Sequence, residues 1–319
     1  MQEPALLAAV DLGSNSFRLE IGRLEGGRIR RVEYLRETVR QGGDLDADHN
    51  LTPAAIERGL CCLRRFARRL AEVAPVRVRA VATQTLREAG NREEFLRRAS
   101  AVLGGVPVEA IAGAEEARLT YLGVAQFLPA SRERRLVVDI GGRSTELVVG
   151  RRMQPLALGS YAMGSVSWSL SHFPDGALTQ ARFDAVRAAA GALLGPALTR
   201  YRRTAWDSAH GASGTLGAVA AALAAAGGPR GVIARAGLLR LREQLLHAGH
   251  VDRLELPSVR ADQRAILGGG LAITLTLFEL LDIERLQIAQ GALRQGLLHQ
   301  LAHTPHGAAP AAPSASSAP

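Results

Sequence analysis

The alternation of apolar and polar positions predicts that the chain begins with strands. An apolar run at 6–10, an alternating segment at 17–22 and a third segment at 28–38 have the two-residue period of strands. Thr52 and Pro53 form an N-cap and a first helical residue, which predict a helix of about 20 residues. The same pattern predicts, further along this half, a strand at 76–82, a helix from Asn91, a strand at 107–111 and a helix from Gly113 to Gln126.

The strand pattern restarts after a polar stretch at 129–135, which we interpret as a linker. Short strands are expected at 136–139, at 146–149 and up to residue 161, and a mostly helical region follows them. This region is predicted to hold helices near 177–201, 213–226, 235–247 and 259–281, a strand at 205–209, a later strand at 284–289 and a last helix at 291–302. The final residues, 304–319, are rich in Ala, Pro and Ser and predict a disordered tail.

One segment of the chain occurs twice. Residues 11–22 align without gaps on 139–150, and both copies read as strand, tight polar turn and strand. A repeat in each half predicts an α/β protein of two related lobes with a cleft between them. We place the N-terminal lobe at 1–126 and the C-terminal lobe at 127–290, and expect the last helix, 291–303, to complete the N-terminal lobe.

Charge narrows the choice of partners. The chain of 319 residues carries a net charge of +9, which indicates anionic partners. All 39 basic residues are arginine, so a conventional Walker-type phosphate loop, which needs lysine, is excluded and any cationic phosphate clamp must use the arginine fork. Aromatic residues make up only 4% of the chain, too few for base-stacking platforms, and no specific nucleic-acid partner is expected.

Cysteine usage and hydropathy favour the cytoplasm. Cys61 and Cys62 are adjacent, which excludes a disulfide framework and a cysteine metal site and suits a reducing compartment. The longest uncharged run, 265–278, is shorter than the roughly 20 residues that a membrane-spanning helix needs. We therefore expect a cytoplasmic protein with no membrane partner.

The two repeated turns have the composition of a phosphate-binding site. Glycine allows backbone amides to approach a ligand closely, and small hydroxyl side chains add donors. Asp11 and Asp139 each stand where a strand ends at its turn, so both are expected to point toward the cleft. The candidate substrate-binding residues are Gly13, Ser14, Asn15 and Ser16 in the first turn and Gly141, Gly142, Ser144 and Thr145 in the second.

Two further segments carry candidate chemistry. In the loop at 210–216, Ser213 or Thr215 is placed to cap the helix that follows, and helix N-termini bind anions, although the loop also fits an ordinary glycine-rich turn. Glu115 and Glu116 open a helix between the two repeats. They either complement the helix dipole or supply a general base that activates water.

Several segments between residues 7 and 302 match motifs of a known family: DLGSNSFRL, ATQTLREA, GAEEARLTYLGV, VVDIGGRSTELVVG, MGSVS, HGASGTLGAV and GALRQGLL. In these segments the chain resembles the exopolyphosphatase/guanosine pentaphosphate phosphatase (Ppx/GppA) family. The resemblance implies the two-lobed sugar kinase–actin-like (ribonuclease H-like) fold, in a short form without the helical C-terminal domain of longer members. It also implies removal of the terminal phosphate of inorganic polyphosphate or of guanosine pentaphosphate, with a homodimer as one assembly.

The resemblance also implies roles for individual residues. Glu116 is implied to be the catalytic base, and Asp139 and Glu146, with Asp11 nearby, to hold Mg²⁺, with Mn²⁺ and K⁺ as alternative ions. Substrate contacts are implied for both repeated turns and for Arg18, Gly211, Ser213, Gly214, Thr215 and Arg294.

Three positions depart from the usual family pattern. Arg143 stands where the second turn usually has a glycine, Gln290 replaces a usual Asp, and Gln295 replaces a usual Glu. If position 143 requires a positive φ, arginine there is strained by about 1–2 kcal/mol. Its guanidinium would otherwise add a substrate-binding charge to the cleft. Together the departures make the cleft more positive and bear on the choice of substrate.

Two other functions share the paired turns. A sugar-kinase-like phosphotransferase would need an adenosine pocket, and the chain shows no signature for one beyond 211–215. A non-catalytic phosphate or nucleotide sensor would follow if Arg143 and Gln290 disabled the site.

Overall fold

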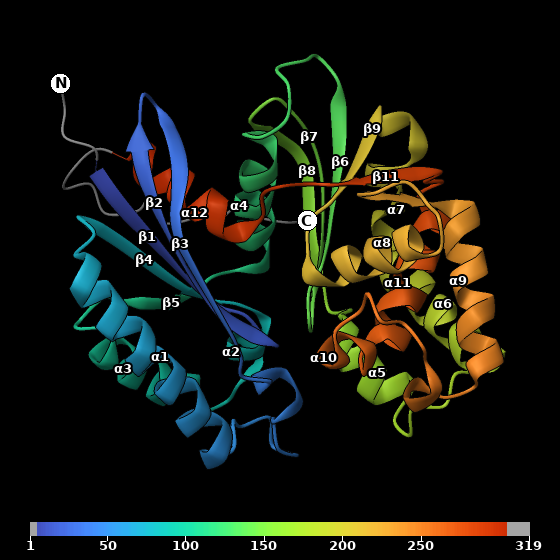
Figure 1. Cartoon of the computed structure of the whole chain (residues 1–319), viewed down its shortest axis with the longest axis horizontal. Helices are drawn as coiled ribbons and strands as arrows, with labels where there is room; N and C mark the ends of the chain where they lie inside the picture. Colours follow the sequence, from blue (N-terminus) through green and yellow to red (C-terminus); the bar gives the residue numbers. More distant parts are fainter. Residues whose placement is uncertain (1–4, 305–319) are drawn as a thin grey trace.

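The computed structural model describes residues 5–304, which form two α/β lobes with a cleft between them (Figure 1). The tail predicted at 304–319 lies outside the described residues from position 305 onward. Within residues 5–304, no helix is both long and apolar enough to cross a membrane.

The first lobe is built on a five-stranded sheet in the order β3-β2-β1-β4-β5. β1, β2 and β3 form antiparallel hairpins, and β4 and β5 continue the sheet in parallel to β1. Residues 7–10 of β1 are fully buried, because helices cover both faces of the sheet. The strands are Ala5–Leu12 (β1), Ser16–Glu25 (β2), Arg28–Thr38 (β3), Arg77–Ala82 (β4) and Val108–Ala110 (β5).

The second lobe repeats this order as β8-β7-β6-β9-β11 and adds β10 at the edge. Its strands are Arg134–Ile140 (β6), Thr145–Arg151 (β7), Gln154–Tyr161 (β8), Ser208–Gly211 (β9), Val232–Ala234 (β10) and Arg285–Ile288 (β11). The hairpin registers also correspond, since Asp11 faces Arg18 in the first sheet and Asp139 faces Glu146 in the second. The repeat seen in the sequence of the hairpins therefore extends in the structure to five strands in each lobe, which confirms the predicted two-lobed sugar kinase–actin-like fold.

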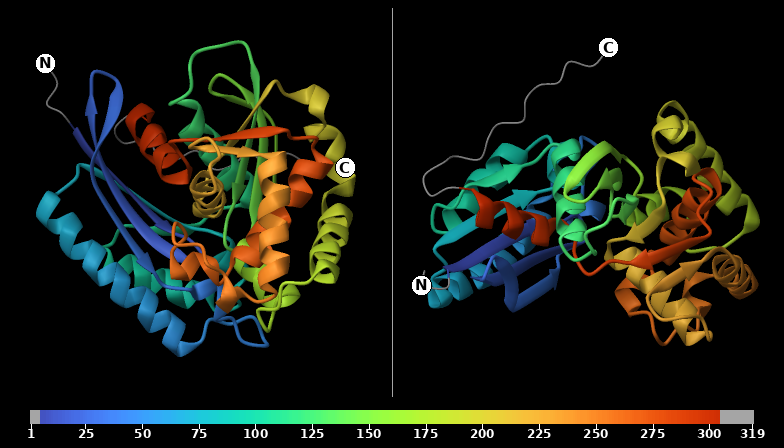
Figure 2. Two further views of the ribbon diagram at one scale, coloured as in Figure 1. Left: turned by 45° about the vertical axis from the view of Figure 1, so that its right-hand side comes forward. Right: turned by 90° about the horizontal axis from the view of Figure 1, so that it is seen from above.

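Helices cover both faces of the first sheet. One face carries Pro53–Val73 (α1), Gln84–Glu88 (α2) and Arg92–Val102 (α3), and the other carries Gly113–Ala125 (α4) and Leu293–His303 (α12). Thr52 caps α1 by accepting a hydrogen bond from the Ala55 amide at 3.2 Å, as its sequence predicts. α12 follows β11 of the second lobe but returns to pack beside α4 (Figures 1 and 2). The other side of α4 contacts β7 and β8, so α4 lies between the lobes.

The second lobe has one large apolar core. Its helices are Ser165–His172 (α5), Gln180–Leu194 (α6), Leu198–Tyr201 (α7), Gly214–Ala225 (α8), Arg235–Ala248 (α9), Ala261–Arg264 (α10) and Leu267–Leu280 (α11). α11 packs against α5, α6, α8 and α9, which explains why its sequence is apolar on every face.

Several predicted boundaries are wrong. The helix expected at 177–201 ends at Leu194, because Pro196 lacks the amide that would continue it. The helix expected at 259–281 is split into α10 and α11, and nothing in its local sequence signals the break. The linker expected at 129–135 is shorter because β6 begins at Arg134, and the strand expected at 205–209 lies at Ser208–Gly211.

Three short elements were not predicted: α2, α5 and β10. Each has eight residues or fewer, which is too short for an apolar period to be read from the sequence. Two of them lie next to the cleft, where α5 supports the second turn and α2 carries Arg87 beside Glu116.

Candidate active site

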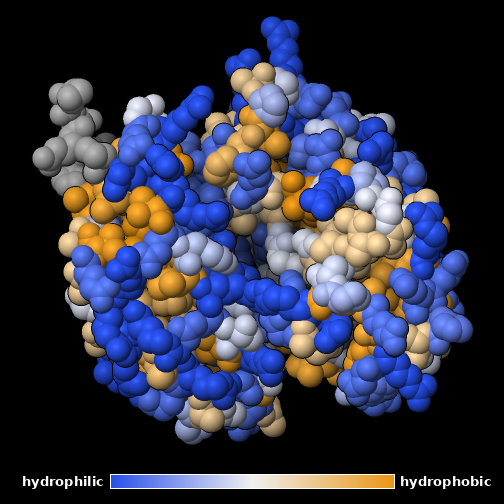
Figure 3. Space-filling model, viewed as in Figure 1, coloured by the Kyte–Doolittle hydropathy of each residue, from blue (hydrophilic) through white to orange (hydrophobic). Residues whose placement is uncertain are grey.

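The cleft between the lobes is a cavity of about 330 Å³. Figure 3 shows the hollow between the lobes, with hydrophilic residues on the side of the first lobe and paler, less hydrophilic residues on the side of the second. Its walls come from both hairpin turns, the first turn of α4, the loop before α8, α10 and the start of α12. Segments from both halves of the chain therefore meet here, as the repeat requires.

The carbonyl groups of the first turn are held by the residues and the short turn that follow β3. The Asn15 oxygen accepts hydrogen bonds from the amides of Val39 at 3.1 Å and Arg40 at 3.0 Å. The Ser14 oxygen accepts one from the Gly42 amide at 2.7 Å, in the 3₁₀ turn Gln41–Gly43 (η1). These bonds fix the orientation of the peptide groups in the turn.

The second turn is held in the same way by the N-terminus of α5. The Gly142 oxygen accepts from the amides of Val166 at 2.8 Å and Ser167 at 3.0 Å. The Gly141 oxygen accepts from the amide of Ser165 at 2.9 Å and from its hydroxyl at 3.1 Å. The segment MGSVS, which leads into α5, thus supports the turn.

The amides of the two turns, unlike their carbonyls, remain available for a ligand. Within residues 5–304, the N–H groups of Ser14, Asn15, Gly142 and Arg143 have no acceptor. The two turns also touch, since a Cβ added at Gly142 would lie 3.1 Å from the Ser14 Cβ. A group of free amides on two adjoining turns is an anion-binding arrangement.

Glu116 lies in the first turn of α4 and is only 8% exposed. The Nη1 of Arg87, on α2, donates to its Oε2 at 2.6 Å and to the Ile111 carbonyl at 3.0 Å. Burial raises the pKa of Glu116, the charge and hydrogen bond of Arg87 lower it, and the charge of Asp11 raises it again, with a net shift upward. A buried carboxylate of raised pKa beside a cleft has the properties of a general base.

Asp139 and Glu146 face the same space from the second hairpin. Asp139 has no hydrogen bond or ion pair within the described part of the chain, whereas Glu146 accepts a hydrogen bond from the Ser160 hydroxyl at 2.7 Å. Burial, followed by the charge of Glu116, raises the pKa of Asp139 to about 8. Burial and the charges of Glu116 and Asp139 also raise the pKa of Glu146 well above its usual range. The buried Glu116 and Glu146 and the partly exposed Asp139 therefore repel one another in one space.

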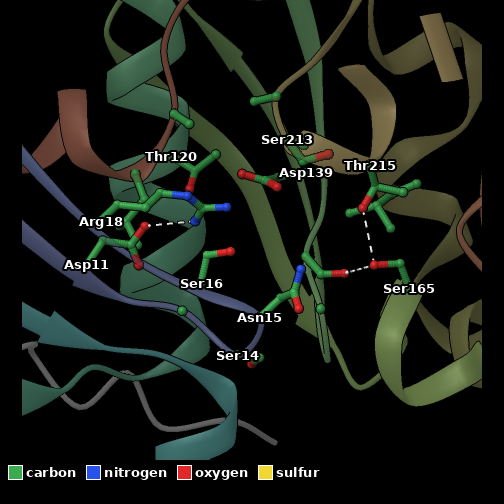
Figure 4. A pocket seen from close by; sticks show the side chains of 18 of the residues that line it. Asp11, Ser14, Asn15, Ser16, Arg18, Thr120, Asp139, Ser165, Ser213 and Thr215 are labelled. Atoms are coloured by element: carbon green, nitrogen blue, oxygen red, sulfur yellow. Dashed lines mark hydrogen bonds and ion pairs between the residues drawn. The ribbon is translucent and has the colours of Figure 1, made fainter. Parts of the chain in front are cut away.

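Asp11 has different partners. Its Oδ2 accepts from Nη1 of Arg18 at 3.1 Å, drawn in Figure 4, and from Nη1 of Arg294 at 3.3 Å. Arg294 is also held by Glu20, whose carboxylate accepts from Nε of Arg294 at 3.2 Å and from Nε2 of Gln295 at 2.6 and 2.7 Å. Asp11 therefore positions two guanidinium groups, and a glutamate at position 295 would place a second carboxylate against Glu20.

The third loop closes the opposite side of the cleft (Figure 4). The Ser213 hydroxyl accepts from the Leu216 amide at 3.1 Å, so Ser213 is the cap of α8. The Thr215 hydroxyl instead donates to the Ser165 hydroxyl at 3.2 Å, which links the loop to the second turn. Ser213, Gly214 and Thr215 all line the cleft.

Three predicted substrate-binding residues, Arg143, Thr145 and Gly211, do not line the cleft. Thr145 is fully buried, and its hydroxyl donates to the Met163 carbonyl at 2.6 Å. Gly211 lies at the end of β9, where an added Cβ would be 2.4 Å from Leu286. Neighbouring strand residues face opposite sides, and this alternation turns both positions away from the cleft.

Arg143 differs from both expectations for it. It is not among the residues with positive φ, so arginine is not strained there. Its guanidinium also does not enter the cleft, because Nη2 pairs with Glu88 at 2.6 Å and Nη1 donates to the Gly42 carbonyl at 2.6 Å. Arg143 thus fastens the second turn to the first lobe.

This contact predicts a measurable coupling between the lobes. In a double-mutant cycle of Arg143→Ala and Glu88→Gln, we expect a coupling free energy of about 1 kcal/mol in urea unfolding. The pair of Arg64 and Glu57, on one face of α1 and about half exposed, serves as the control and should show almost none. Strictly additive changes in the free energy of unfolding at positions 143 and 88 would show that this ion pair does not couple the two lobes.

Some residues in the cleft or beside it were missed by sequence reasoning. Arg87 lies within the motif ATQTLREA, but only the fold places it against Glu116. Arg36 faces Arg18 across the β2–β3 hairpin, and counting the register of that hairpin would have found it. The other lining residues that were not predicted include Tyr34, Thr83, Thr120, Ser165, Arg260 and Gln263.

Comparison with known proteins identifies the family. The profile of the Ppx/GppA phosphatase family matches residues 21–305. This chain belongs to the Ppx/GppA phosphatase family. Among solved structures, an exopolyphosphatase-like protein is 25% identical with a TM-score of 0.84, and the match covers 94% of this chain and 98% of that one. The Ppx/GppA family member of Aquifex aeolicus is 25% identical with a TM-score of 0.78, over 93% and 97% of the two chains. An exopolyphosphatase from Cytophaga hutchinsonii, 22% identical with a TM-score of 0.82 over 93% and 97%, shares the fold.

The carboxylates of this Ppx/GppA protein fit a divalent cation. Asp139 and Glu146 have no cationic side chain paired with them within residues 5–304, and burial together with the charge of Glu116 raises the pKa of both. The described residues contain no group of three or more acidic, histidine or cysteine side chains close enough to enclose a metal on their own. Mg²⁺ is commonly held by one or two carboxylates, with water and substrate phosphates completing its shell. Asp139 and Glu146 match that donor set, whereas Asp11 is already neutralised by two arginines.

Proposed function

We propose that this protein is an exopolyphosphatase that hydrolyses the terminal phosphoryl group of inorganic polyphosphate. The observation that carries this proposal is the meeting of free turn amides with the buried carboxylate of Glu116 in a single cleft. Family membership and the names of the similar solved structures support the same reaction class. Guanosine pentaphosphate is the second substrate that we propose, because it ends in the same kind of phosphate chain.

In the proposed reaction, the free amides of the two turns hold the terminal phosphoryl group. Arg18 and Arg294, oriented by Asp11 and Glu20, offset its negative charge. Glu116 accepts a proton from a water molecule, whose oxygen forms a bond to the terminal phosphorus. The bond from that phosphorus to the bridging oxygen breaks, and its electron pair stays on the shortened chain. No covalent bond to the protein is formed.

Asp139 and Glu146 would hold the divalent cation that we propose as cofactor, Mg²⁺ with Mn²⁺ as an alternative. When bound, this ion supplies positive charge that polarises the phosphoryl oxygens. The roles of the two carboxylates are thus separate from that of Glu116, whose ion pair with Arg87 keeps it on the α4 side of the cleft.

The assay that tests the function incubates the purified protein and Mg²⁺ with polyphosphate, with guanosine pentaphosphate, or with ATP and an acceptor alcohol. We expect orthophosphate release from polyphosphate and from guanosine pentaphosphate. A sugar-kinase-like transferase would instead consume ATP only when an acceptor alcohol is present. The absence of phosphate release from both proposed substrates would refute the proposal.

The ion pair of Arg87 and Glu116 predicts a change in pH dependence. Arg87 lowers the pKa of Glu116, so the variant Arg87→Met should raise that pKa. A base must be ionised, and the acidic limb of the kcat profile should therefore move to higher pH. Arg87→Lys, which retains a positive charge, should move the limb less. An acidic limb at the same pH in the wild type and Arg87→Met would argue against Glu116 as the base.

A further inference from the structure

A second set of charges lies beside the cleft and joins the two lobes. Asp262, on α10, accepts a hydrogen bond from Nη2 of Arg36, on β3 of the first lobe, at 3.3 Å. Its other carboxylate oxygen accepts from Nε of Arg260 at 2.9 Å. Both arginines line the cleft, and the roles proposed above use neither of them.

Arg36 connects this group of charges to the phosphate turns. Its Nε and Nη2 donate to the Ser16 hydroxyl at 3.2 and 3.1 Å, and it faces Arg18 across the β2–β3 hairpin. Partial burial lowers the pKa of Arg36, and the positive charges of Arg18 and Arg260 lower it further. Like charges placed opposite each other in a hairpin destabilise it. A bound polyanion would relieve that repulsion.

The arginines of the cleft form a row that connects the two lobes. Arg18 lies beside Asp11 and lines the cleft together with Asp139. Arg36 is the neighbour of Arg18 on the next strand. Arg260 lies on the second lobe and is linked to Arg36 through Asp262. The basic side chains thus lead from the place proposed for the terminal phosphate across to the second lobe. Planar guanidinium groups pair with phosphate as they pair with a carboxylate, often through two hydrogen bonds.

We propose that Arg36 and Arg260 form a second phosphate subsite, which binds phosphoryl groups further along the chain, and that Asp262 occupies this subsite until substrate displaces its carboxylate. This inference rests on the proposed function, because it assumes that the terminal phosphate lies at the two turns. The ligand of the subsite is a linear phosphate chain long enough to extend beyond the two turns, as free polyphosphate is.

The subsite makes affinity depend on chain length. Tripolyphosphate held at the turns has few phosphoryl groups left to compete with Asp262, whereas a long chain offers many. A long chain should therefore bind through both sites, and a short one mainly through the first.

The test compares KM for tripolyphosphate and for long-chain polyphosphate. Arg260 is 51% exposed, so its replacement should leave the fold intact. Because charge-assisted hydrogen bonds are strong, Arg260→Ala should raise the long-chain KM roughly 10-fold relative to the tripolyphosphate KM. Asp262→Asn should lower the long-chain KM. Arg240→Ala, which removes an exposed charge on α9 outside the cleft, is the control and should alter neither value.

Equal changes for both chain lengths in Arg260→Ala, or a higher long-chain KM in Asp262→Asn, would overturn the subsite. Guanosine pentaphosphate, whose 5′ phosphate arm is as short as tripolyphosphate, is the short-arm comparison: its KM should change no more in Arg260→Ala than the tripolyphosphate KM does, and a change as large as that for long-chain polyphosphate would contradict the dependence on chain length. Calorimetric binding of long-chain polyphosphate in the presence of a chelator repeats the test without turnover. If the wild type binds polyphosphate and Arg260→Ala binds it roughly 10-fold more weakly, the subsite stands even if no phosphate is released. In that case only the proposed function fails.

Discussion

Replacement of Glu116 by glutamine is expected to lower kcat for orthophosphate release by roughly 10²- to 10⁴-fold. Glutamine has nearly the same shape, so it can still fill the buried position at the start of α4. It cannot accept the proton of the attacking water. Since Glu116 is not assigned to substrate binding, KM should change much less than kcat, and steady-state kinetics with polyphosphate measures both.

The chain provides a matched control for this variant. Glu115 is the preceding residue in the same helical turn, but it pairs with Arg118 at 2.7 Å and does not line the cleft. Glu115→Gln should therefore retain the wild-type kcat. Equal activity of Glu116→Gln and the wild type, or equal losses in both variants, would remove Glu116 from the reaction.

Replacement of Gly123 by alanine is expected to lower the free energy of unfolding by about 3 kcal/mol. At this position α4 and α12 cross with their backbones in contact, and an added Cβ would lie 1.9 Å from the Ala292 carbonyl oxygen. Gly296 makes the reciprocal approach, 1.9 Å from the Leu119 carbonyl oxygen. Backbone atoms cannot give way as the end of a flexible side chain can, so the two helices must separate.

Urea unfolding of Gly123→Ala measures this effect, and Gly191→Ala is its control. Gly191 lies within α6, where an added Cβ meets nothing within 4 Å. Alanine there should stabilise the protein by about 0.5–1 kcal/mol, the usual helical preference over glycine. Because α4 carries Glu116 and α12 carries Arg294, Gly123→Ala should also lose activity. A free energy of unfolding equal to that of the wild type in Gly123→Ala would show that α4 and α12 are not in close backbone contact at this position.

Much of the fold could be predicted because one hairpin sequence occurs in each half of the chain. The repeated segment led to both hairpins, and the apolar periods led to most strands and to α1, α4 and α12. The break between α10 and α11 could not be predicted, because it occurs where residues of α10 contact distant parts of the chain. There the Gln263 amide donates to the Gly214 carbonyl at 2.9 Å, and Asp262 pairs with Arg36 of the other lobe. Such partners, which are distant in the sequence, cannot be inferred from the residues near the break.

The candidate site shows the same division. Residues within the repeated turns, such as Ser14 and Gly142, were found from composition and spacing alone. The partners that give side chains their roles come from distant parts of the chain, as Arg87 does for Glu116. Arg143 shows the limit most clearly, since its charge was expected in the cleft and instead pairs with Glu88.

The central claim is that water, directed by Glu116, attacks the terminal phosphorus of a polyphosphate chain. A single-turnover reaction in water labelled with oxygen-18, followed by mass spectrometry of the orthophosphate released, tests it most directly. The account predicts that each orthophosphate carries one oxygen from water and that the shortened chain carries none. Unlabelled orthophosphate with the label on the remaining chain, or no orthophosphate at all, would contradict it.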